Sequence, residues 1–182
     1  MVVVDATFLL LILDPNVKVP GGKEGRPAPS GVQDRIALLL SRLRKAKESI
    51  LVPTPVLSEV LMIADSSVSD LVDKINQFSA FEVVPFDQIA AIELADIARN
   101  EPGKKRDKTT TYAKLKYDRQ IVAIAKVRSA TQILSDDASL AALGKKLGIE
   151  VLGIADLPLP DKSRQPDLLD RLAEPENKPD DK

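Results

Sequence analysis

The sequence of 182 residues contains neither cysteine nor histidine. Without cysteine the chain has no disulfide bond, no thiol nucleophile and no zinc–thiolate site. Without histidine it lacks the usual general base and the commonest ligand of transition metals. If the protein is a hydrolase, carboxylates must therefore do the chemistry, and carboxylates favour hard cations such as Mg²⁺ or Mn²⁺.

Aromatic residues make up 3% of the chain, and no apolar run is long enough to cross a bilayer. With 44% hydrophobic residues, the chain has the composition of a globular protein with an aliphatic core. The formal net charge of -1 does not indicate any class of partner, so any binding of nucleic acid requires a local basic patch. The apolar N-terminus carries Asp5 and lacks a basic leader, so we expect a cytoplasmic protein without a membrane partner.

Short aliphatic segments alternate with amphipathic segments along most of the chain. This alternation predicts an α/β fold with a parallel sheet, right-handed crossovers and helices on both faces. The segments predicted to form strands are 2–4, 50–53, 81–85, 131–134 and 150–152. The segments predicted to form helices are 8–13, 32–47, 56–64, a stretch from Ser67 or Ser69 to Phe78, a stretch capped by Asp87, 118–127 and 137–147.

The sequence predicts one folded domain over residues 1–158. A tail rich in proline and acids follows at 159–182, and we expect it to be flexible apart from a short helix at 167–172. Residues 15–31 are rich in Pro, Gly and Lys and predict an irregular loop. The helix over 56–64 is apolar almost all round, so we expect it to be buried, with Thr54 as its cap.

Acidic residues interrupt the apolar pattern at four places. Asp5 follows the first strand, and Asp136 and Asp137 follow the fourth, while Glu59 and Asp118 share helix faces with apolar residues. Burying a lone carboxylate is costly, and several together repel one another. A bound divalent cation relieves both problems and can polarise a phosphodiester, so these acids are candidate metal ligands.

Each acid also has an ordinary structural explanation. Asp5 could cap the helix that follows it, and Glu59 could face solvent. Asp118 and Asp137 could be acids favoured by the dipole at a helix N-terminus. The joint pattern, not any single acid, therefore supports a metal site. Two hydroxyls beside the acids could orient metal ligands or water: those of Thr7 and Ser135.

The joint pattern resembles the PIN domain family of metal-dependent ribonucleases, and its small VapC-like members in particular. The segments that carry the resemblance are 3–7, 55–60, 117–125 and 133–137, and the last two are the most specific. The resemblance implies a three-layer α/β/α sandwich with a central, mostly parallel sheet of about five strands. It also implies endonucleolytic cleavage of RNA that depends on Mg²⁺ or Mn²⁺, with a 5′-phosphate and a 3′-hydroxyl on the products.

Carried over residue by residue, the resemblance assigns the metal-ligand and catalytic set to Asp5, Glu59, Asp118 and Asp137. The family's last acid usually falls two positions after the hydroxyl residue that ends the strand. That rule favours Asp137 over Asp136, although both stay candidates. Thr7 matches a hydroxyl commonly found two positions after the first acid. The resemblance further implies the toxin of a toxin–antitoxin pair, an antitoxin partner and a homodimer.

A basic run leads directly into Asp118. A lip of positive charge beside a metal site would bind the phosphates of RNA, with an affinity that depends on salt. The alternative is a solvated loop without function, which is what such runs usually are. The candidate RNA-binding residues are Lys104, Lys105, Arg106, Lys108, Lys114, Lys116 and Arg119.

Three other interpretations deserve comparison with a nuclease. A phosphatase of the haloacid-dehalogenase type needs a second aspartate two positions after the nucleophile, where this chain has Thr7. A receiver domain needs a phospho-acceptor aspartate at the end of the third strand, where Pro85 lies. The remaining alternative is a PIN-like module that binds RNA or protein without cleavage, and weak metal binding would favour it.

Overall fold

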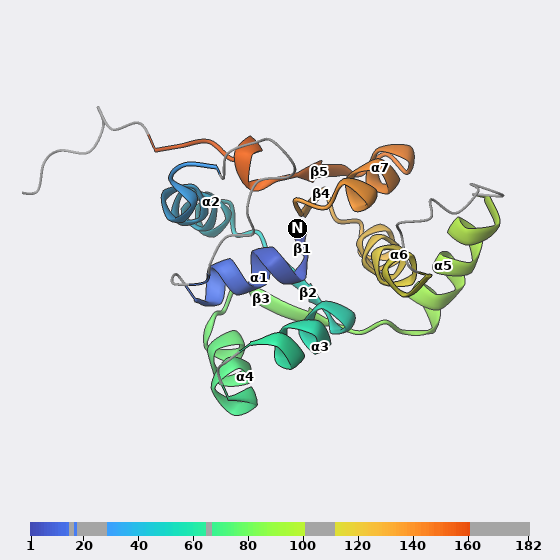
Figure 1. Cartoon of the computed structure of the whole chain (residues 1–182), viewed down its shortest axis with the longest axis horizontal. Coiled ribbons are helices and arrows are strands. Elements are labelled where there is room, and N and C mark those ends of the chain that lie inside the picture. The colour runs from blue at the N-terminus through green and yellow to red at the C-terminus, as the bar shows by residue number, and fades with distance from the viewer. Residues whose placement is uncertain (15–16, 18–28, 65–66, 101–111, 161–182) are drawn as a thin grey trace, which may run out of the picture.

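The computed structural model describes residues 1–14, 17, 29–64, 67–100 and 112–160. Within them, five parallel strands form one sheet in the order β3-β2-β1-β4-β5 (Figure 1). This architecture confirms the predicted α/β/α fold with a central parallel sheet. The strands are β1 (Val2–Val4), β2 (Ile50–Pro53), β3 (Phe81–Val84), β4 (Gln132–Leu134) and β5 (Glu150–Leu152).

The strand order reverses at β1, and this reversal determines where a site can form. The chain adds β2 and then β3 on one side of β1, and it then returns to add β4 and β5 on the other side. Val4 of β1 lies opposite Leu134 of β4, so these two strands end at the same level. In open parallel sheets, ligands bind outside the carboxyl ends of the strands at such a switch point.

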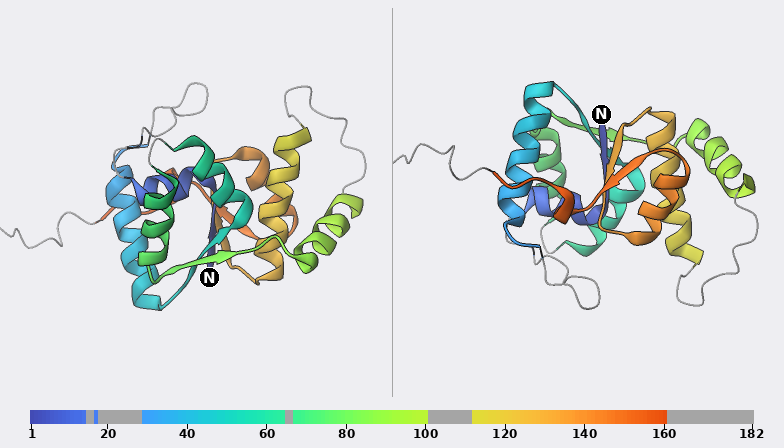
Figure 2. Two further views of the ribbon diagram at one scale, coloured as in Figure 1. Left: turned by 90° about the horizontal axis from the view of Figure 1, so that it is seen from below. Right: turned by 90° about the horizontal axis from the view of Figure 1, so that it is seen from above.

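Helices cover both faces of the sheet. Figure 2 shows α2 and α4 on one side of the strands and α6 and α7 on the other. Helix α6 contacts β1 and β4, and α1 contacts α2, α3 and α4. The helices are α1 (Ala6–Leu13), α2 (Val32–Ala46), α3 (Thr54–Ile63), α4 (Val68–Gln77), α5 (Gln88–Asn100), α6 (Tyr112–Val127) and α7 (Ala138–Lys146), followed by the 3-10 turn η1 (Ile154–Asp156).

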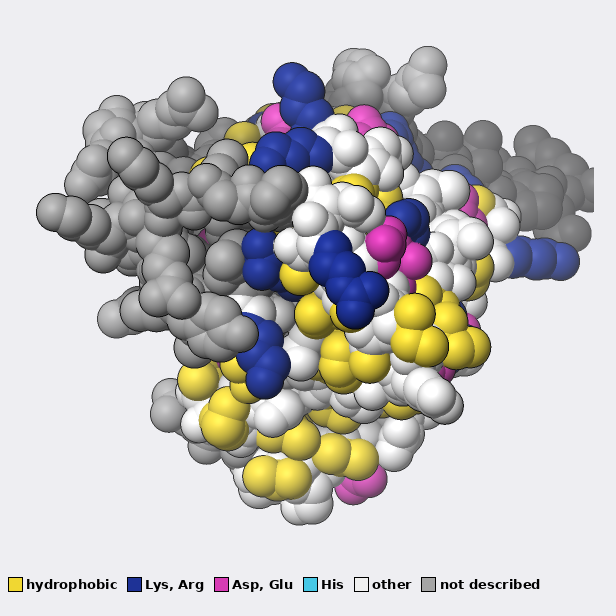
Figure 3. Space-filling model, turned by 90° about the vertical axis from the view of Figure 1, so that its right-hand side faces the viewer, with side chains coloured by type: hydrophobic (Ala, Val, Ile, Leu, Met, Phe, Trp, Pro, Cys, Tyr) yellow, Lys and Arg dark blue, Asp and Glu magenta, His cyan; other side chains and the backbone are white. Residues whose placement is uncertain are grey.

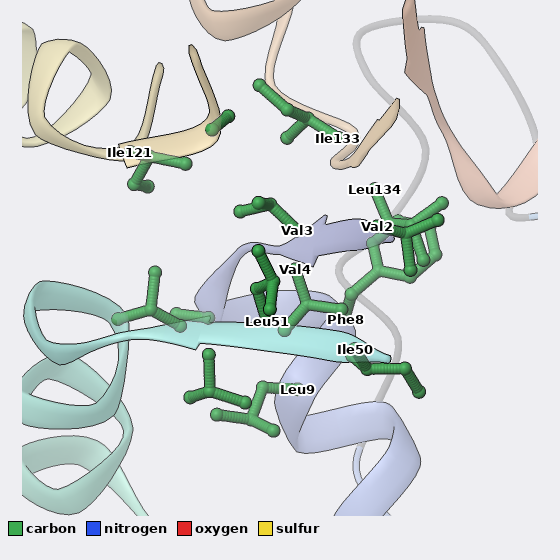
Figure 4. Close-up of a cluster of buried hydrophobic side chains, with 14 of the residues drawn as sticks. Val2, Val3, Val4, Phe8, Leu9, Ile50, Leu51, Ile121, Ile133 and Leu134 are labelled. Carbon is green, nitrogen blue, oxygen red and sulfur yellow. The ribbon is translucent and has the colours of Figure 1, made fainter. Parts of the chain in front are cut away.

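An aliphatic core fills the space between the sheet and the helices. Every residue of β1 and β2 is buried, which explains why these strands are continuous apolar runs. Figure 4 shows side chains of β1, β2 and β4 packed with Phe8 and Leu9 of α1. Burial on both faces rigidly positions the strand ends from which the acids project.

Side-chain caps begin several helices as the sequence predicts. Ser67, and not Ser69, caps α4 by accepting the N–H of Asp70, and Asp87 accepts the N–H of Ala90. Thr54 is not a cap, because β2 runs directly into α3 and Thr54 is already the first helical residue. Its hydroxyl instead accepts the N–H of Phe86 at 3.0 Å and ties α3 to the end of β3.

Helix α3 is not buried all round, so that prediction is wrong. Within the helix only Val56 and Val60 are buried, whereas Met62 is 69% exposed and Ile63 is 57% exposed. The two valines are four residues apart and form the single stripe that a helix presents to its neighbour. Helix α3 therefore has an apolar sequence although part of its surface is exposed to solvent.

The C-terminal part of the described chain packs back onto the domain. Leu157 is buried, and its carbonyl accepts a hydrogen bond from Nη1 of Arg35 in α2. The same nitrogen donates to the carbonyl of Ala155 at 3.2 Å. The chain is described as far as Pro160. Most of the predicted loop 15–31, nearly all of the tail 159–182 and its short helix at 167–172 lie outside the described residues, and the domain boundary at 158 stays a prediction.

Candidate metal centre

Four separate elements bring acids to the carboxyl edge of the sheet. Asp5 follows β1 and Asp137 follows β4, and these are neighbouring strands. Glu59 lies in α3 and Asp118 in α6, two helices that contact each other. This is the edge at which the strand order reverses, so the acids lie where an open parallel sheet places its ligand.

Asp5 is both a helix cap and a partly buried acid. Its Oδ1 accepts the N–H of Phe8 at 2.8 Å, which begins α1. Burial raises the pKa of Asp5 from 3.8 to about 6, and the charges of Asp136 and Asp137 add to the increase. The N–H of Phe8 and the hydroxyl of Ser135 oppose it by stabilising the charged form. Asp5 therefore caps α1, as the structural alternative predicts, and its carboxyl group also has a raised pKa.

Ser135 connects the ends of β1 and β4. Its side chain is buried, it hydrogen-bonds Asp5, and its Oγ accepts the N–H of Asp137 at 3.0 Å. The N–H of Asp5 donates to the carbonyl of Leu134 at 3.1 Å, which continues the pairing of the two strands. Ser135 thus hydrogen-bonds two of the acids, and its role in orienting metal ligands stays a prediction.

Asp118 is a buried acid in the middle of a helix. Helix α6 starts at Tyr112, six residues before Asp118, so the predicted start of this helix at 118 is wrong and Asp118 is not an acid at a helix N-terminus. The pKa of Glu59 is raised, first by burial and then by the charge of Asp118. Glu59 itself is partly exposed.

Asp136 and Asp137 have different surroundings. Oδ1 of Asp137 caps α7 by accepting the N–H groups of Ser139 at 2.7 Å and Leu140 at 3.2 Å. Asp136 is exposed, and its Oδ1 accepts the N–H of Ile154 at 3.0 Å, which anchors the turn after β5. Asp136 thus has a structural role in this turn. Its charge acts on Asp5 as that of Asp137 does, but it is Asp137 that shares the hydroxyl of Ser139 with Asp118.

The hydroxyl of Ser139 lies between two of the acids, although no sequence pattern marks it as a site residue. Its Oγ is 2.5 Å from Oδ2 of Asp118 and 2.6 Å from Oδ1 of Asp137. The contact with Asp137 could have been expected from the position of Ser139 in the first turn of α7. The contact with Asp118 depends on how α6 packs against α7, for which the sequence carries no signal.

The other predicted site residues are less well defined. Thr7 lies in the first turn of α1, partly buried. Lys116 and Arg119 lie in α6 on either side of Asp118; Lys116 is exposed and Arg119 partly buried. Lys114 belongs to the same helix. The rest of the predicted basic run lies outside the described residues: Lys104, Lys105, Arg106 and Lys108.

The donors present match a hard divalent cation in kind. Among the described residues, no three acidic side chains converge into a ready-made metal-binding group. Mg²⁺, however, is usually held by one or two carboxylates, together with water and substrate phosphates. Asp118 and Asp137, close enough to contact one hydroxyl oxygen, meet that requirement. Within the described part of the chain, no helix has both the length and the apolar character needed to cross a membrane.

Comparison with known proteins agrees with this architecture. The pattern of the PIN domain family matches residues 25–156. No curated protein matches the sequence. A chain of VapBC2 from Rickettsia felis, solved bound to a DNA fragment from their promoter, is similar with a TM-score of 0.55 and 11% identity over 84% of this chain and 98% of that one. VapC20 from Mycobacterium tuberculosis, a sarcin–ricin loop cleaving toxin, is similar with a TM-score of 0.50 and 12% identity over 79% of this chain and 95% of that one. At such low identities these structures share the fold, and the match to the family over most of the sequence shows that the chain belongs to the PIN domain family.

Proposed function

We propose that this protein is a divalent-metal-dependent endoribonuclease. The observation that supports it best is the electrostatic coupling of acids from four elements at one edge of the sheet. The charges of Asp136 and Asp137 act on Asp5 and that of Asp118 acts on Glu59, while Asp118 and Asp137 contact one hydroxyl. The raised pKa of Asp5 and of Glu59 shows that their charged forms are costly to the fold, which favours a functional role for them.

In this proposal Asp5, Glu59, Asp118 and Asp137 hold one or two Mg²⁺ or Mn²⁺ ions. Such ions, when bound, polarise a phosphodiester and activate water for attack on the phosphorus. Ser135 orients the carboxylate of Asp5 through its hydrogen bond, and Thr7 is proposed to assist beside it. Lys116 and Arg119, together with the basic run that precedes α6, would attract the RNA backbone.

RNA is the proposed substrate class, and a toxin is the proposed biological role. VapC20, which shares the fold, is described as a sarcin–ricin loop cleaving toxin. The VapBC2 structure was solved on DNA from the promoter of its own genes. By analogy we propose an antitoxin partner for this chain. If the protein is a toxin, its expression should arrest the growth of the host cells. Co-expression of a small DNA-binding protein encoded beside it should restore growth, and continued growth arrest would count against that partner.

The decisive experiment is cleavage of a mixed RNA pool by the purified protein, with Mn²⁺ or Mg²⁺ and with EDTA. The Asp118→Asn variant should lose cleavage by at least about 100-fold, because residues that merely orient ligands already cost roughly 10- to 100-fold. Full activity of this variant would refute the assigned site. Tight metal binding without cleavage would point to a narrow substrate or a missing partner, and absence of both would favour a PIN-like binding module.

The two acids after β4 provide a matched comparison within this experiment. Asp137→Asn should reduce cleavage as severely as Asp118→Asn does. Asp136→Asn keeps an acceptor oxygen for the N–H of Ile154, so the turn after β5 should persist and cleavage should stay close to wild type. The opposite ranking of the two variants would assign the metal to Asp136.

A further inference from the structure

A single hydroxyl lies between acids from two different elements. Ser139, in the first turn of α7, places its Oγ 2.5 Å from Oδ2 of Asp118 and 2.6 Å from Oδ1 of Asp137. Asp118 comes from α6 and is buried, whereas Asp137 caps α7. The two contacts thus connect residues that are far apart in the sequence.

The chemistry of the hydroxyl makes this arrangement unusual. A serine hydroxyl carries one proton, and ionised carboxylates only accept hydrogen bonds. Ser139 can therefore donate to only one of the two ionised carboxylates at a time, in a charge-assisted O–H···O⁻ bond. Its other short contact then brings two oxygens together without a proton between them. Two negative charges held this close repel each other when no cation lies between them. The hydroxyl offsets part of that repulsion.

Backbone N–H groups hold Asp137 in place, and the hydroxyl of Ser139 connects Asp137 to Asp118. Oδ1 of Asp137 accepts two backbone N–H groups at the start of α7, those of Ser139 and Leu140. The hydroxyl of Ser139 then connects this anchored carboxylate to Asp118 on α6. A cap alone would not need the second contact, because capping involves only groups of the same helix.

We propose that Ser139 is a positioning residue, whose hydroxyl holds Asp118 and Asp137 at the spacing from which they share one divalent cation. This inference rests on the proposed function only in that both use the same two acids. In this role Ser139 affects the affinity for the metal. Partners that orient metal ligands in this way typically contribute roughly 10- to 100-fold in metal affinity.

The test measures Mn²⁺ binding to the full chain by titration calorimetry, together with the Mn²⁺ concentration needed for half-maximal cleavage. Ser139→Ala should weaken Mn²⁺ binding by about 10- to 100-fold and shift the half-maximal concentration equally. At saturating Mn²⁺ its kcat should approach that of wild type. Ser41→Ala, which removes an exposed hydroxyl from α2, should change neither quantity.

A second pair of variants protects the test against a folding defect. Ser139→Thr and Ser139→Val have nearly the same shape and differ in the hydroxyl. The threonine variant should therefore bind Mn²⁺ about 10- to 100-fold more tightly than the valine variant. Wild-type Mn²⁺ affinity in Ser139→Ala, or equal affinity in the matched pair, would overturn the inference, as would absence of Mn²⁺ binding to the wild type. If the wild type binds Mn²⁺ without cleaving RNA and Ser139→Ala weakens that binding, the nuclease proposal fails while the role of Ser139 stands.

Discussion

At the scale of single residues, Asp5 faces opposing demands on its charge. The N–H of Phe8 and the hydroxyl of Ser135 stabilise the carboxylate, whereas burial and the neighbouring acids destabilise it more, so that its pKa rises to about 6. An acid with a higher pKa in the folded chain than in the unfolded chain binds its proton more tightly when folded. Its ionisation therefore costs stability as the pH rises from the unfolded pKa through the folded one, and the cost is complete above about pH 6.

Asp5→Asn tests this cost directly, because asparagine caps a helix about as well as aspartate does. In EDTA at about pH 8 the variant should be more stable than wild type by up to about 3 kcal/mol, which is the raised pKa of Asp5 converted at about 1.36 kcal/mol per unit. Near pH 4 most of this difference should vanish, because Asp5 is then protonated in the folded chain and only about half ionised in the unfolded chain. Urea denaturation at the two pH values measures it. A variant less stable than wild type at about pH 8 would contradict the proposed penalty.

At the scale of secondary-structure elements, α3 shows how an apolar helix can be half exposed. It carries Glu59, so its packing determines where that acid lies relative to Asp118. Val56 and Val60 are fully buried against the domain, while Met62 and Ile63 face outward. The position of Glu59 therefore depends on one stripe of the helix and not on its overall hydrophobicity.

Two substitutions in α3 should have unequal effects on stability. Val60→Ala should lower the free energy of unfolding by about 1.5–3 kcal/mol, because a fully buried side chain is truncated. Met62→Ala, at a position 69% exposed, should change it by about 0.5 kcal/mol or less. The midpoint of urea denaturation reports both. Equal losses would mean that Met62 is covered in solution.

At the scale of the whole molecule, apolar side chains remain on the surface around α5. Figure 3 shows the face on which α5, α6 and α7 lie, with hydrophobic side chains gathered in its lower half, below most of the Lys and Arg side chains. Ile89 and Ile92 lie one turn apart on α5 and are 62% and 63% exposed, and Val83 on the edge strand β3 is 41% exposed. Exposed apolar side chains of this kind are typical of an interface when they gather on one face.

The homodimer that the resemblance to the PIN domain family implies could bury this surface against a second copy of the chain. The wild type should then sediment as a dimer at micromolar concentrations, and the double variant Ile89→Ser with Ile92→Ser as a monomer. Both side chains are exposed in the single chain, so the variant should retain the fold and its circular dichroism spectrum. A wild type that remains monomeric as its concentration rises would remove the case for this interface.

The sequence by itself determined the parts of this protein that depend on local chemistry. Aliphatic runs predicted the five strands and proline, serine and aspartate signals predicted most helix boundaries, because periodicity and capping act over a few residues. Acids after two strands predicted a site at the carboxyl edge, because parallel strands end on the same side. Only the tertiary structure decided that Asp118 lies mid-helix beside Ser139, that Asp136 holds the turn at Ile154, and that half of α3 is exposed. These contacts join segments distant in the sequence, and helix packing creates them without leaving any local pattern.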